Sequence, residues 1–95
     1  MKKGTILYVR EDYRVDDVEV TEKDYLDHIA YLEQVAKDRY FLGGGFVEKG
    51  GGMIIFEAAS KAEAIKIADG DPLISRNLFT YDLTPWEMVV VSEGK

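Results

Sequence analysis

The stretch RYFLGGGFVEKGGGMIIFEA, residues 39–58, decides the fold because it predicts a β-hairpin in the middle of the chain. Two runs rich in β-forming residues flank glycines that can adopt positive φ, with room for a β-bulge. We expect the two strands at about residues 40–47 and 52–58. The segments on either side of this hairpin then determine which sheet it joins.

Before the hairpin, the sequence predicts one strand and one helix. TILYVR, residues 5–10, is short, apolar and rich in β-formers, and the acidic stretch EDYRVDDVEV after it is interpreted as a loop. Thr21 begins a Thr-x-x-Asp pattern that can cap a helix, and an apolar stripe then continues to about Arg39. This is the first predicted helix.

After the hairpin, the sequence predicts a second and shorter helix. Ser60 and Glu63 form another capping pattern, and KAEAIKIA consists of good helix formers. Gly70 supplies a left-handed stop, and Pro72 prevents the helix from continuing.

The end of the chain completes the order of elements. DPLISRNLFTYDL is interpreted as an irregular or partly helical connector, and WEMVVV, residues 86–91, as the last strand. The order βαββαβ is the split βαβ pattern of a ferredoxin-like fold. The predicted class is therefore α+β, with one four-stranded antiparallel sheet and both helices on one face.

The strands also predict what lies on the other face of the sheet. A sheet with one face in water alternates apolar and polar residues, whereas MIIF and MVVV are apolar on both sides of the pleat. The face without helices is therefore expected to pack against another surface, and a second copy of the chain is the simplest partner. Two such sheets stacked face to face would form a dimeric α+β barrel.

Composition limits the partners and the sources of stability. The 95 residues form one small domain, 1–95, and a net charge of −6 argues against nucleic acid as a partner. No long apolar run or leader is apparent, so no membrane association and a cytoplasmic location are expected. With one histidine, no cysteine and no zinc-binding spacing, no metal or cofactor is expected, which leaves a partner subunit as the support for a small core.

The single histidine is the first candidate for chemistry. On a helical period, His28 shares the apolar stripe with Tyr25 and Leu32, so its imidazole is predicted to point inward. An imidazole can accept and donate a proton near neutral pH, but a lone inward histidine also commonly has a structural role at the edge of a core.

An aspartate near the second helix is the second candidate. Asp71 lies between Gly70 and Pro72, where an aspartate also commonly satisfies backbone donors of a turn, and Asp69 could take the same role. In a βαββαβ fold this region and the first helix share one face of the sheet, so a carboxylate there could reach His28 and form an acid–base dyad.

The remaining candidates would shape a ligand pocket. Gly44, Gly45 and Phe46 lie in FLGGGF, where bare backbone can approach a ligand, although a flexible hairpin is the simpler interpretation of that motif. Aromatic residues, Tyr25 among them, are more commonly part of a core or an interface. Arg10 or Arg76 could bind an anionic group, although each is more typical of a solvated surface charge.

Several of these segments together resemble the YciI-like (YCII-related) family over nearly the whole chain. They are HIAYLEQ, the GG turn after YFL, MIIFEAAS, AEAIKIADGDPLISRNLF and a tryptophan near the last strand. The Asp-Pro pair followed by an aromatic residue is the most specific of these features. The family usually has Gly-Pro in the turn where this chain has Gly44, Gly45 and Phe46, so the pocket wall differs there.

The resemblance implies a dimeric α+β barrel whose active site places a histidine and an aspartate, here His28 and Asp71, beside a pocket. Some related proteins catalyse cofactor-independent lyase or dehalogenation reactions on aromatic compounds. The sequence therefore predicts a cofactor-free homodimeric enzyme that performs lyase-, dehalogenase- or isomerase-like proton transfer on a small cyclic or aromatic metabolite. Substrate contacts are assigned to Tyr25, Gly44, Gly45, Phe46 and Arg76. The alternative is a non-catalytic dimeric module for small-molecule binding or assembly.

Overall fold

The computed structural model describes residues 1–93 and confirms the predicted order of elements, with one short helix added. The elements are β1 (Ile6–Arg14), α1 (Glu22–Ala36), β2 (Phe41–Gly45), β3 (Gly52–Phe56), α2 (Lys61–Asp69), α3 (Pro72–Ser75) and β4 (Phe79–Glu87).

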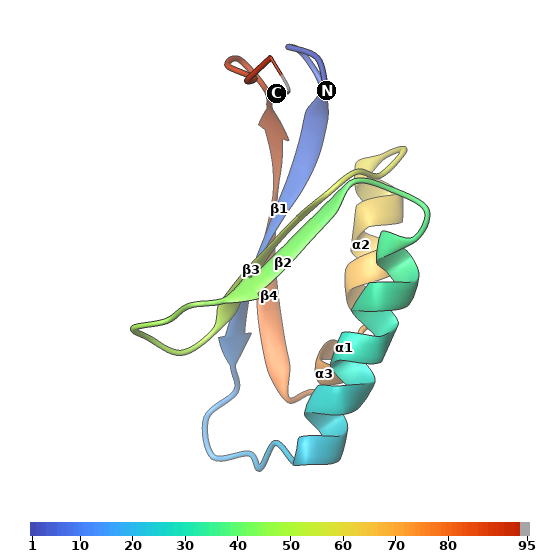
Figure 1. The fold of residues 1–95 in the computed structure, drawn as a ribbon. Helices are drawn as coiled ribbons and strands as arrows, with labels where there is room; N and C mark the ends of the chain where they lie inside the picture. Colours follow the sequence, from blue (N-terminus) through green and yellow to red (C-terminus); the bar gives the residue numbers. More distant parts are fainter. Residues whose placement is uncertain (94–95) are drawn as a thin grey trace.

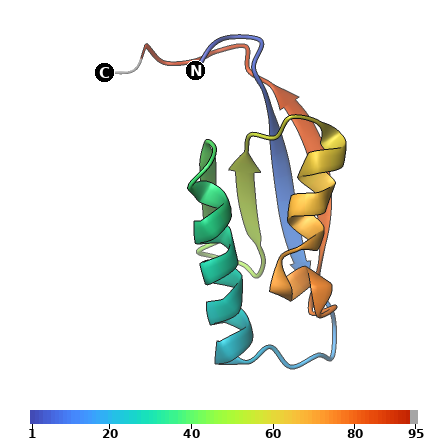
Figure 2. The same ribbon diagram turned by 90° about the vertical axis from the view of Figure 1, so that its right-hand side faces the viewer.

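The four strands form one antiparallel sheet in the order β2-β3-β1-β4. The helices lie on one face of this sheet, as the two ribbon views show together (Figures 1 and 2). The sheet is strongly twisted, since β2 and β3 run diagonally across β1 and β4 (Figure 1). This is the ferredoxin-like α+β fold that the sequence predicts.

Both long helices begin where the capping residues predict. Thr21 and Asp24 form a complete capping box at the start of α1, with each side chain bonded to the backbone of the other residue. The Ser60 side chain accepts from the Glu63 amide at the start of α2, but the Glu63 carboxylate accepts from the amide of Ala59 instead of Ser60. The second capping pattern is therefore only partly formed.

The prediction that residues 11–20 form a loop is wrong for the first part, because β1 continues to Arg14. Arg10 and Asp12 both face the helices, where their opposite charges pair instead of reaching water. The loop begins only after this pair, and it includes Asp17 with a positive φ of 61°. Because Arg10 and Asp12 pair with each other inside the fold, this charged segment belongs to the strand and not to a loop.

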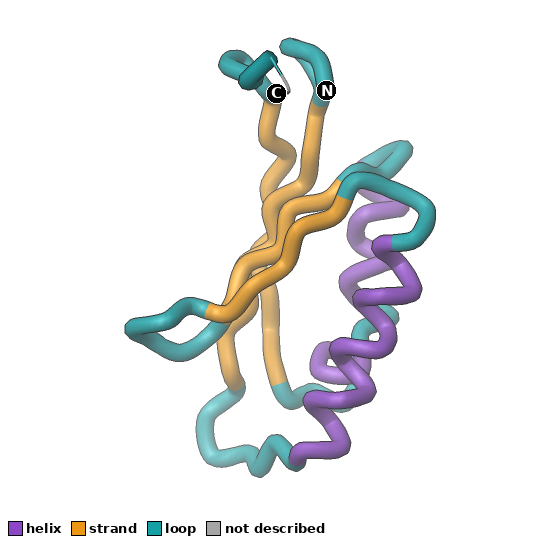
Figure 3. The backbone as a smooth tube through the Cα atoms, viewed as in Figure 1, coloured by secondary structure: helices purple, strands orange, loops and turns teal. Residues whose placement is uncertain are grey.

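The prediction of a last strand at residues 86–91 is also wrong, because β4 spans Phe79–Glu87. It pairs with the whole length of β1, from Phe79 opposite Arg14 to Glu87 opposite Ile6. Pro85 is tolerated because β4 is an edge strand, where a missing N–H costs little. In Figure 3 the strand ends where the segment beyond it turns into a loop, and Val90 there is 85% exposed.

The turn between α2 and α3 differs from the prediction in its use of Gly70. Gly70 has φ −78°, so it is not a left-handed stop. Glycine is needed there because a Cβ would lie 2.4 Å from the hydroxyl oxygen of Tyr31, which itself donates to the carbonyl of Ile67 at 2.7 Å. Pro72, which was expected only to end α2, occupies the first turn of α3, where its missing N–H costs nothing.

The two faces of the sheet have different surroundings. Under the helices, Tyr8, Ile54 and Phe56 pack with Leu32 and Ala64 in the hydrophobic core. The opposite face, which we call the open face, carries exposed apolar side chains, including Leu42, Met53 and Trp86. The expectation that MIIF is apolar on both sides of the sheet is thus confirmed. Within residues 1–93, no helix is both long enough and apolar enough to cross a bilayer.

Candidate active site

Asp71 is held in place by the turn in which it lies. It is the N-cap of α3, and its Oδ1 accepts a hydrogen bond of 3.0 Å from the amide of Leu73. Pro72 restricts the backbone immediately after it. The carboxylate is 0% exposed, so every bond that it makes is protected from water.

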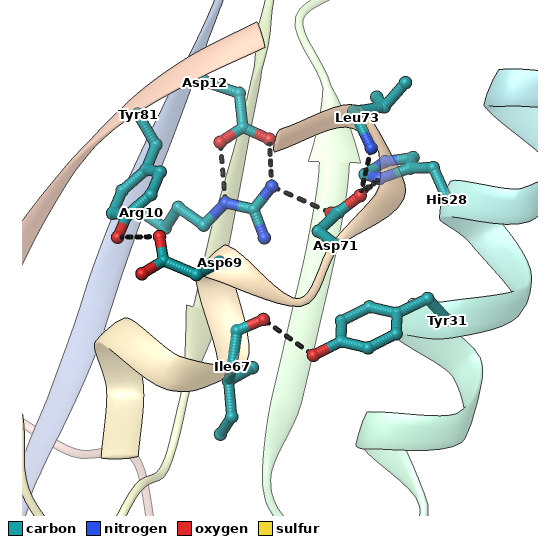
Figure 4. Close-up of polar contacts among 9 residues, drawn as sticks. All are labelled: Arg10, Asp12, His28, Tyr31, Ile67, Asp69, Asp71, Leu73 and Tyr81. Carbon is teal, nitrogen blue, oxygen red and sulfur yellow. Dashed lines mark hydrogen bonds and ion pairs between the residues drawn. The ribbon is translucent and has the colours of Figure 1, made fainter. Parts of the chain in front are cut away.

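The structure brings His28 and Asp71 together, although 43 residues separate them in the chain. His28 projects from α1 toward the α2–α3 turn, and its Nδ1 lies 2.8 Å from Oδ1 and 2.7 Å from Oδ2 of Asp71 (Figure 4). Asp69, the other candidate partner, instead accepts from the Tyr81 hydroxyl at 2.9 Å. The inward direction of His28 and its meeting with Asp71 are as the sequence predicts.

Arg10 joins this pair to a second carboxylate. Its Nη2 donates to Asp71 Oδ2 at 2.8 Å and to Asp12 Oδ2 at 2.9 Å, while its Nε donates to Asp12 Oδ1 at 2.7 Å (Figure 4). Arg10 is 1% exposed, so the interpretation of it as a solvated surface charge is wrong. We call Arg10, Asp12, His28 and Asp71 the buried charge cluster.

Sequence reasoning considered Arg10 only as a possible anion-binding residue and missed both its burial and its pairing with Asp12. A signal was present, because Tyr8, Arg10 and Asp12 alternate along one face of β1, and Tyr8 is a core residue. Assigning Asp12 to a loop hid that alternation. An arginine and an aspartate two positions apart on the inner face of a strand require a mutual ion pair, since neither can be buried alone.

The cluster sets the ionisation of its members. Burial acts to raise the pKa of Asp71, but hydrogen bonds from His28 and Arg10 and the charge of Arg10 outweigh burial and lower it. Burial is also the largest influence on Asp12, and there it prevails over Arg10, so the pKa of Asp12 is raised. Burial acts to lower the pKa of Arg10, but Asp12 and Asp71 together raise it. Asp71 is therefore an ionised acceptor at neutral pH.

Ionised Asp71 determines which nitrogen of His28 carries a proton. A carboxylate only accepts hydrogen bonds, so Nδ1 of His28 must be the donor. In the neutral ring, Nε2 is then an unprotonated acceptor. Within residues 1–93, Nε2 makes no hydrogen bond, and no fully buried side-chain nitrogen or oxygen there lacks a partner, so Nε2 is open to solvent or a ligand.

A cavity of about 550 Å³ lies between α1 and the sheet, a size suited to a small organic ligand. His28 and Asp12 line it, while Asp71 and Arg10 lie behind them. Its wall is mostly apolar and is formed by Asp12, Tyr25, His28, Ile29, Leu32, Glu33, Ala36, Phe41, Gly43, Gly44, Gly45, Gly51, Gly52, Met53, Ile54, Leu73 and Phe79.

Three of the five predicted substrate contacts lie in this wall, and two do not. Tyr25, Gly44 and Gly45 line the cavity, and the Tyr25 ring lies 5.7 Å from the ring of His28. Phe46 is outside the wall, at the hairpin turn, where Lys49 lies over its ring. Arg76 is also outside and is paired at 2.8 Å with both Asp24 and Asp27 of α1.

Among residues 1–93, no group of three His, Asp or Glu side chains is arranged to hold a metal ion. The chemistry that these residues themselves offer is proton transfer. An oriented imidazole with a free Nε2, at the wall of an apolar cavity, can take a proton from a bound molecule and return it. Asp71 would stabilise the positive charge that the ring gains in that step.

Comparison with solved structures finds a neighbour with a similar fold. It is 5-chloro-2-hydroxyhydroquinone dehydrochlorinase from Burkholderia phenoliruptrix AC1100, solved in complex with 2,5-dihydroxybenzoquinone. The match has a TM-score of 0.69 and 22% sequence identity, and it covers 87% of this chain and 94% of the neighbour. At this identity the likeness supports the fold alone. None of the curated proteins matches the chain.

The family to which the chain belongs follows from a separate comparison. The YCII-related domain matches residues 6–87, which include every helix and strand described above. The matched region also contains all four residues of the buried charge cluster. The protein is thus a member of the YCII-related domain family.

Proposed function

We propose that this protein is a small cofactor-independent enzyme in which His28 is the general acid and base and Asp71 orients it. The observation that carries this proposal is the bond of 2.7 Å between His28 Nδ1 and Asp71 at the wall of a cavity, with Nε2 left free. The ligand is a small cyclic or aromatic metabolite, because the cavity is mostly apolar and includes the aromatic residues Tyr25, Phe41 and Phe79.

The reaction is a proton transfer coupled to the movement of an electron pair. Nε2 of His28 removes a proton from a hydroxyl or an acidic C–H group of the ligand, and the released pair moves into the ring. In an elimination, the released pair ends in a new π bond while the carbon–halogen bonding pair leaves with the halide. In an isomerisation, the imidazolium returns the proton to another atom. A positioned base of this kind contributes roughly 10² to 10⁴ in rate.

The structural neighbour supports the lyase or dehalogenase version of this proposal. Its name describes the removal of chloride from a chlorinated hydroxyhydroquinone, and its bound molecule is a dihydroxybenzoquinone. Loss of a proton and a chloride from such a ring needs a base and a leaving group, and the cavity here offers the base in His28.

The test is chloride release from chlorinated hydroquinones by the wild type and by His28→Gln. We expect the variant to lose roughly 10² to 10⁴ in kcat. Gln34→Ala is the matched control, because Gln34 is exposed on the same helix and lies outside the cavity wall. A folded His28→Gln variant with unchanged turnover would remove the catalytic assignment.

A second measurement tests the dyad without a substrate. Because His28 is the only histidine, one set of imidazole ¹⁵N resonances reports on it without assignment ambiguity. We expect the neutral ring to carry its proton on Nδ1, and we expect Asp71→Asn to reduce that preference. A neutral ring protonated on Nε2 in the wild type would contradict the proposal.

The alternative function is a non-catalytic binding or assembly module, and it shares one structural feature with the enzyme. The open face exposes Leu42, Met53 and Trp86, which supports a homodimer in which two sheets stack as an α+β barrel. A dimer in the cytoplasm belongs to either version, and the absence of cysteine agrees with that compartment. If His28→Gln still bound ring compounds and its turnover did not differ from that of the wild type, the result would favour the module.

A further inference from the structure

The ionisable side chains around the cavity share one property. They are Asp12, Tyr25, His28 and Glu33, and among the residues described no lysine or arginine lines the wall. A ligand carboxylate in this cavity would therefore meet the carboxylates of Asp12 and Glu33 and no lysine or arginine side chain.

The two arginines that could have supplied such a cation both lie outside the cavity wall and pair with carboxylates. Arg10 lies behind the wall, and its Nε and Nη2 bond to Asp12 and Asp71. Arg76 is outside the cavity and pairs with Asp24 and Asp27. The expectation that one of them binds an anionic group therefore has no support from their positions.

The two members of the buried charge cluster that line the cavity, Asp12 and His28, both offer hydrogen-bond acceptors. Nε2 of His28 is an acceptor because Asp71 holds the proton of the neutral ring on Nδ1. Each oxygen of Asp12 receives one hydrogen bond from Arg10, and a carboxylate oxygen can accept two. Apart from the Tyr25 hydroxyl, the polar side chains of the wall thus require a ligand that donates.

We propose that the cavity binds uncharged ring compounds with two hydroxyl donors, one for Asp12 and one for Nε2 of His28, and that Asp12 excludes carboxylates. The inference rests on the proposed function, because it takes the same cavity as the ligand site. It gives Asp12, which is 6% exposed, the role of a specificity-determining residue. The same pairing would orient the ring so that the hydroxyl on His28 is the one that loses its proton.

The test uses three ring compounds that differ at one position: resorcinol, 3-hydroxybenzamide and 3-hydroxybenzoate. Their dissociation constants for the full chain are measured by calorimetry or ligand-observed NMR at neutral pH. We expect resorcinol and the benzamide to bind about tenfold or more tightly than the benzoate. The benzamide matches the benzoate in shape, so that pair isolates the effect of charge in the wild type alone.

Asp12→Asn then tests the residue that we assign. It keeps the size of the side chain, removes its negative charge and adds a donor, so we expect the preference for resorcinol over the benzoate to fall by about tenfold. Glu11→Gln is the matched control, because Glu11 is the next residue of β1, faces the open side of the sheet and carries the same charge. It should leave the preference unchanged.

Three outcomes would overturn the inference. They are equal or tighter binding of the benzoate by the wild type, no binding of resorcinol and the benzamide at millimolar concentration, and an unchanged preference in folded Asp12→Asn. If that variant fails to fold, the benzamide and benzoate pair in the wild type still decides the charge preference. Because binding is measured without turnover, a catalytically neutral His28→Gln would reject the proposed reaction and leave this preference intact.

Discussion

Each face of the sheet carries a group of side chains of the kind usually found on the other. The face covered by helices contains Arg10 and Asp12, both nearly inaccessible, while the open face exposes Leu42 and Trp86, which are 55% and 48% accessible. In a monomer with no other role, apolar side chains would be expected under the helices and charges on the open face. These two exceptions are the basis for assigning the proposed active site to one face and the proposed dimer interface to the other.

We interpret this difference as a separation between the proposed active site and the proposed dimer interface. Buried ion pairs contribute little net stability compared with apolar residues of the same size, so the buried charge cluster is best explained by the site it forms with His28 and Asp71. The open face carries Leu42, Met53 and Trp86, with Glu11 and Asp82 paired in strand register toward one end of it, and it is the surface we assign to a second copy. The predictions below test this separation.

The largest effect is expected from Asp71→Asn. Removing this charge leaves Arg10 with one carboxylate and deprives His28 of its acceptor, so the free energy of unfolding should fall by about 3–5 kcal/mol. Urea unfolding measures the change. Asp69→Asn, two residues away and exposed, should cost less than about 1 kcal/mol. Equal losses for the two variants would mean that the cluster has no special role.

The difference in stability between the wild type and Asp71→Asn should also depend on pH. The folded pKa of Asp71 is lowered, while the unfolded carboxyl has an ordinary pKa near 3.9. Between these two values the unfolded chain binds more protons, so the contribution of Asp71 to stability is fully present above about pH 5 and is lost as pH falls through the folded pKa. The stability gap between wild type and Asp71→Asn should therefore narrow under acid. A gap that stays constant down to about pH 2 would contradict this account.

On the open face, Leu42→Glu should weaken self-association without unfolding the monomer. A charge in an apolar interface costs about 2–3 kcal/mol, or roughly a hundredfold in the dimer dissociation constant. Sedimentation equilibrium measures that constant, and circular dichroism checks the fold. Ile65→Glu is the control, because Ile65 is exposed on α2, on the helical side of the molecule. Equal effects of the two variants would remove the open face as the interface.

The smallest effect concerns the packing that positions the α2–α3 turn. Gly70→Ala should cost about 1–2 kcal/mol, because the new Cβ would meet the hydroxyl of Tyr31. Tyr31→Phe removes that hydroxyl, so the double variant should lose less stability than the sum of the losses in the two single variants. Gly44→Ala is the control, since nothing lies within 4 Å of a Cβ there. Thermal unfolding of the wild type and these four variants is sufficient, and strict additivity would reject the proposed contact.

Much of the fold could be predicted because local signals agreed with one another. Thr21 and Ser60 marked the helix starts, and the glycine-rich hairpin between the helices determined the order of elements. The meeting of His28 and Asp71 followed from that order, since both lie on the layer that covers one face of the sheet. The distance between the two side chains, and the choice of Asp71 over Asp69 as the partner, became known only from the structure.

The remaining features depend on contacts between distant residues. Arg10 and Asp12 look like loop or surface charges until Asp71, some 60 residues later, is placed beside them. The apolar run MVVV led to a predicted last strand at residues 86–91, whereas pairing with β1 places β4 at Phe79–Glu87. Gly70 resembled a helix stop because glycine can serve either to allow a positive φ or to leave room for a neighbouring group. Only the position of Tyr31 shows that the second reason applies here.

The bare backbone of β2 has a consequence for how broadly such a site can act. Gly43, Gly44 and Gly45 form one wall of the cavity, and β2 is an edge strand with a neighbour on one side only. A wall without side chains can shift at little energetic cost, while the opposite wall is fixed by the bonds around Asp71. Ring substituents directed at the glycines should therefore be interchangeable, which would give one rigid proton-transfer group a family of acceptable substrates.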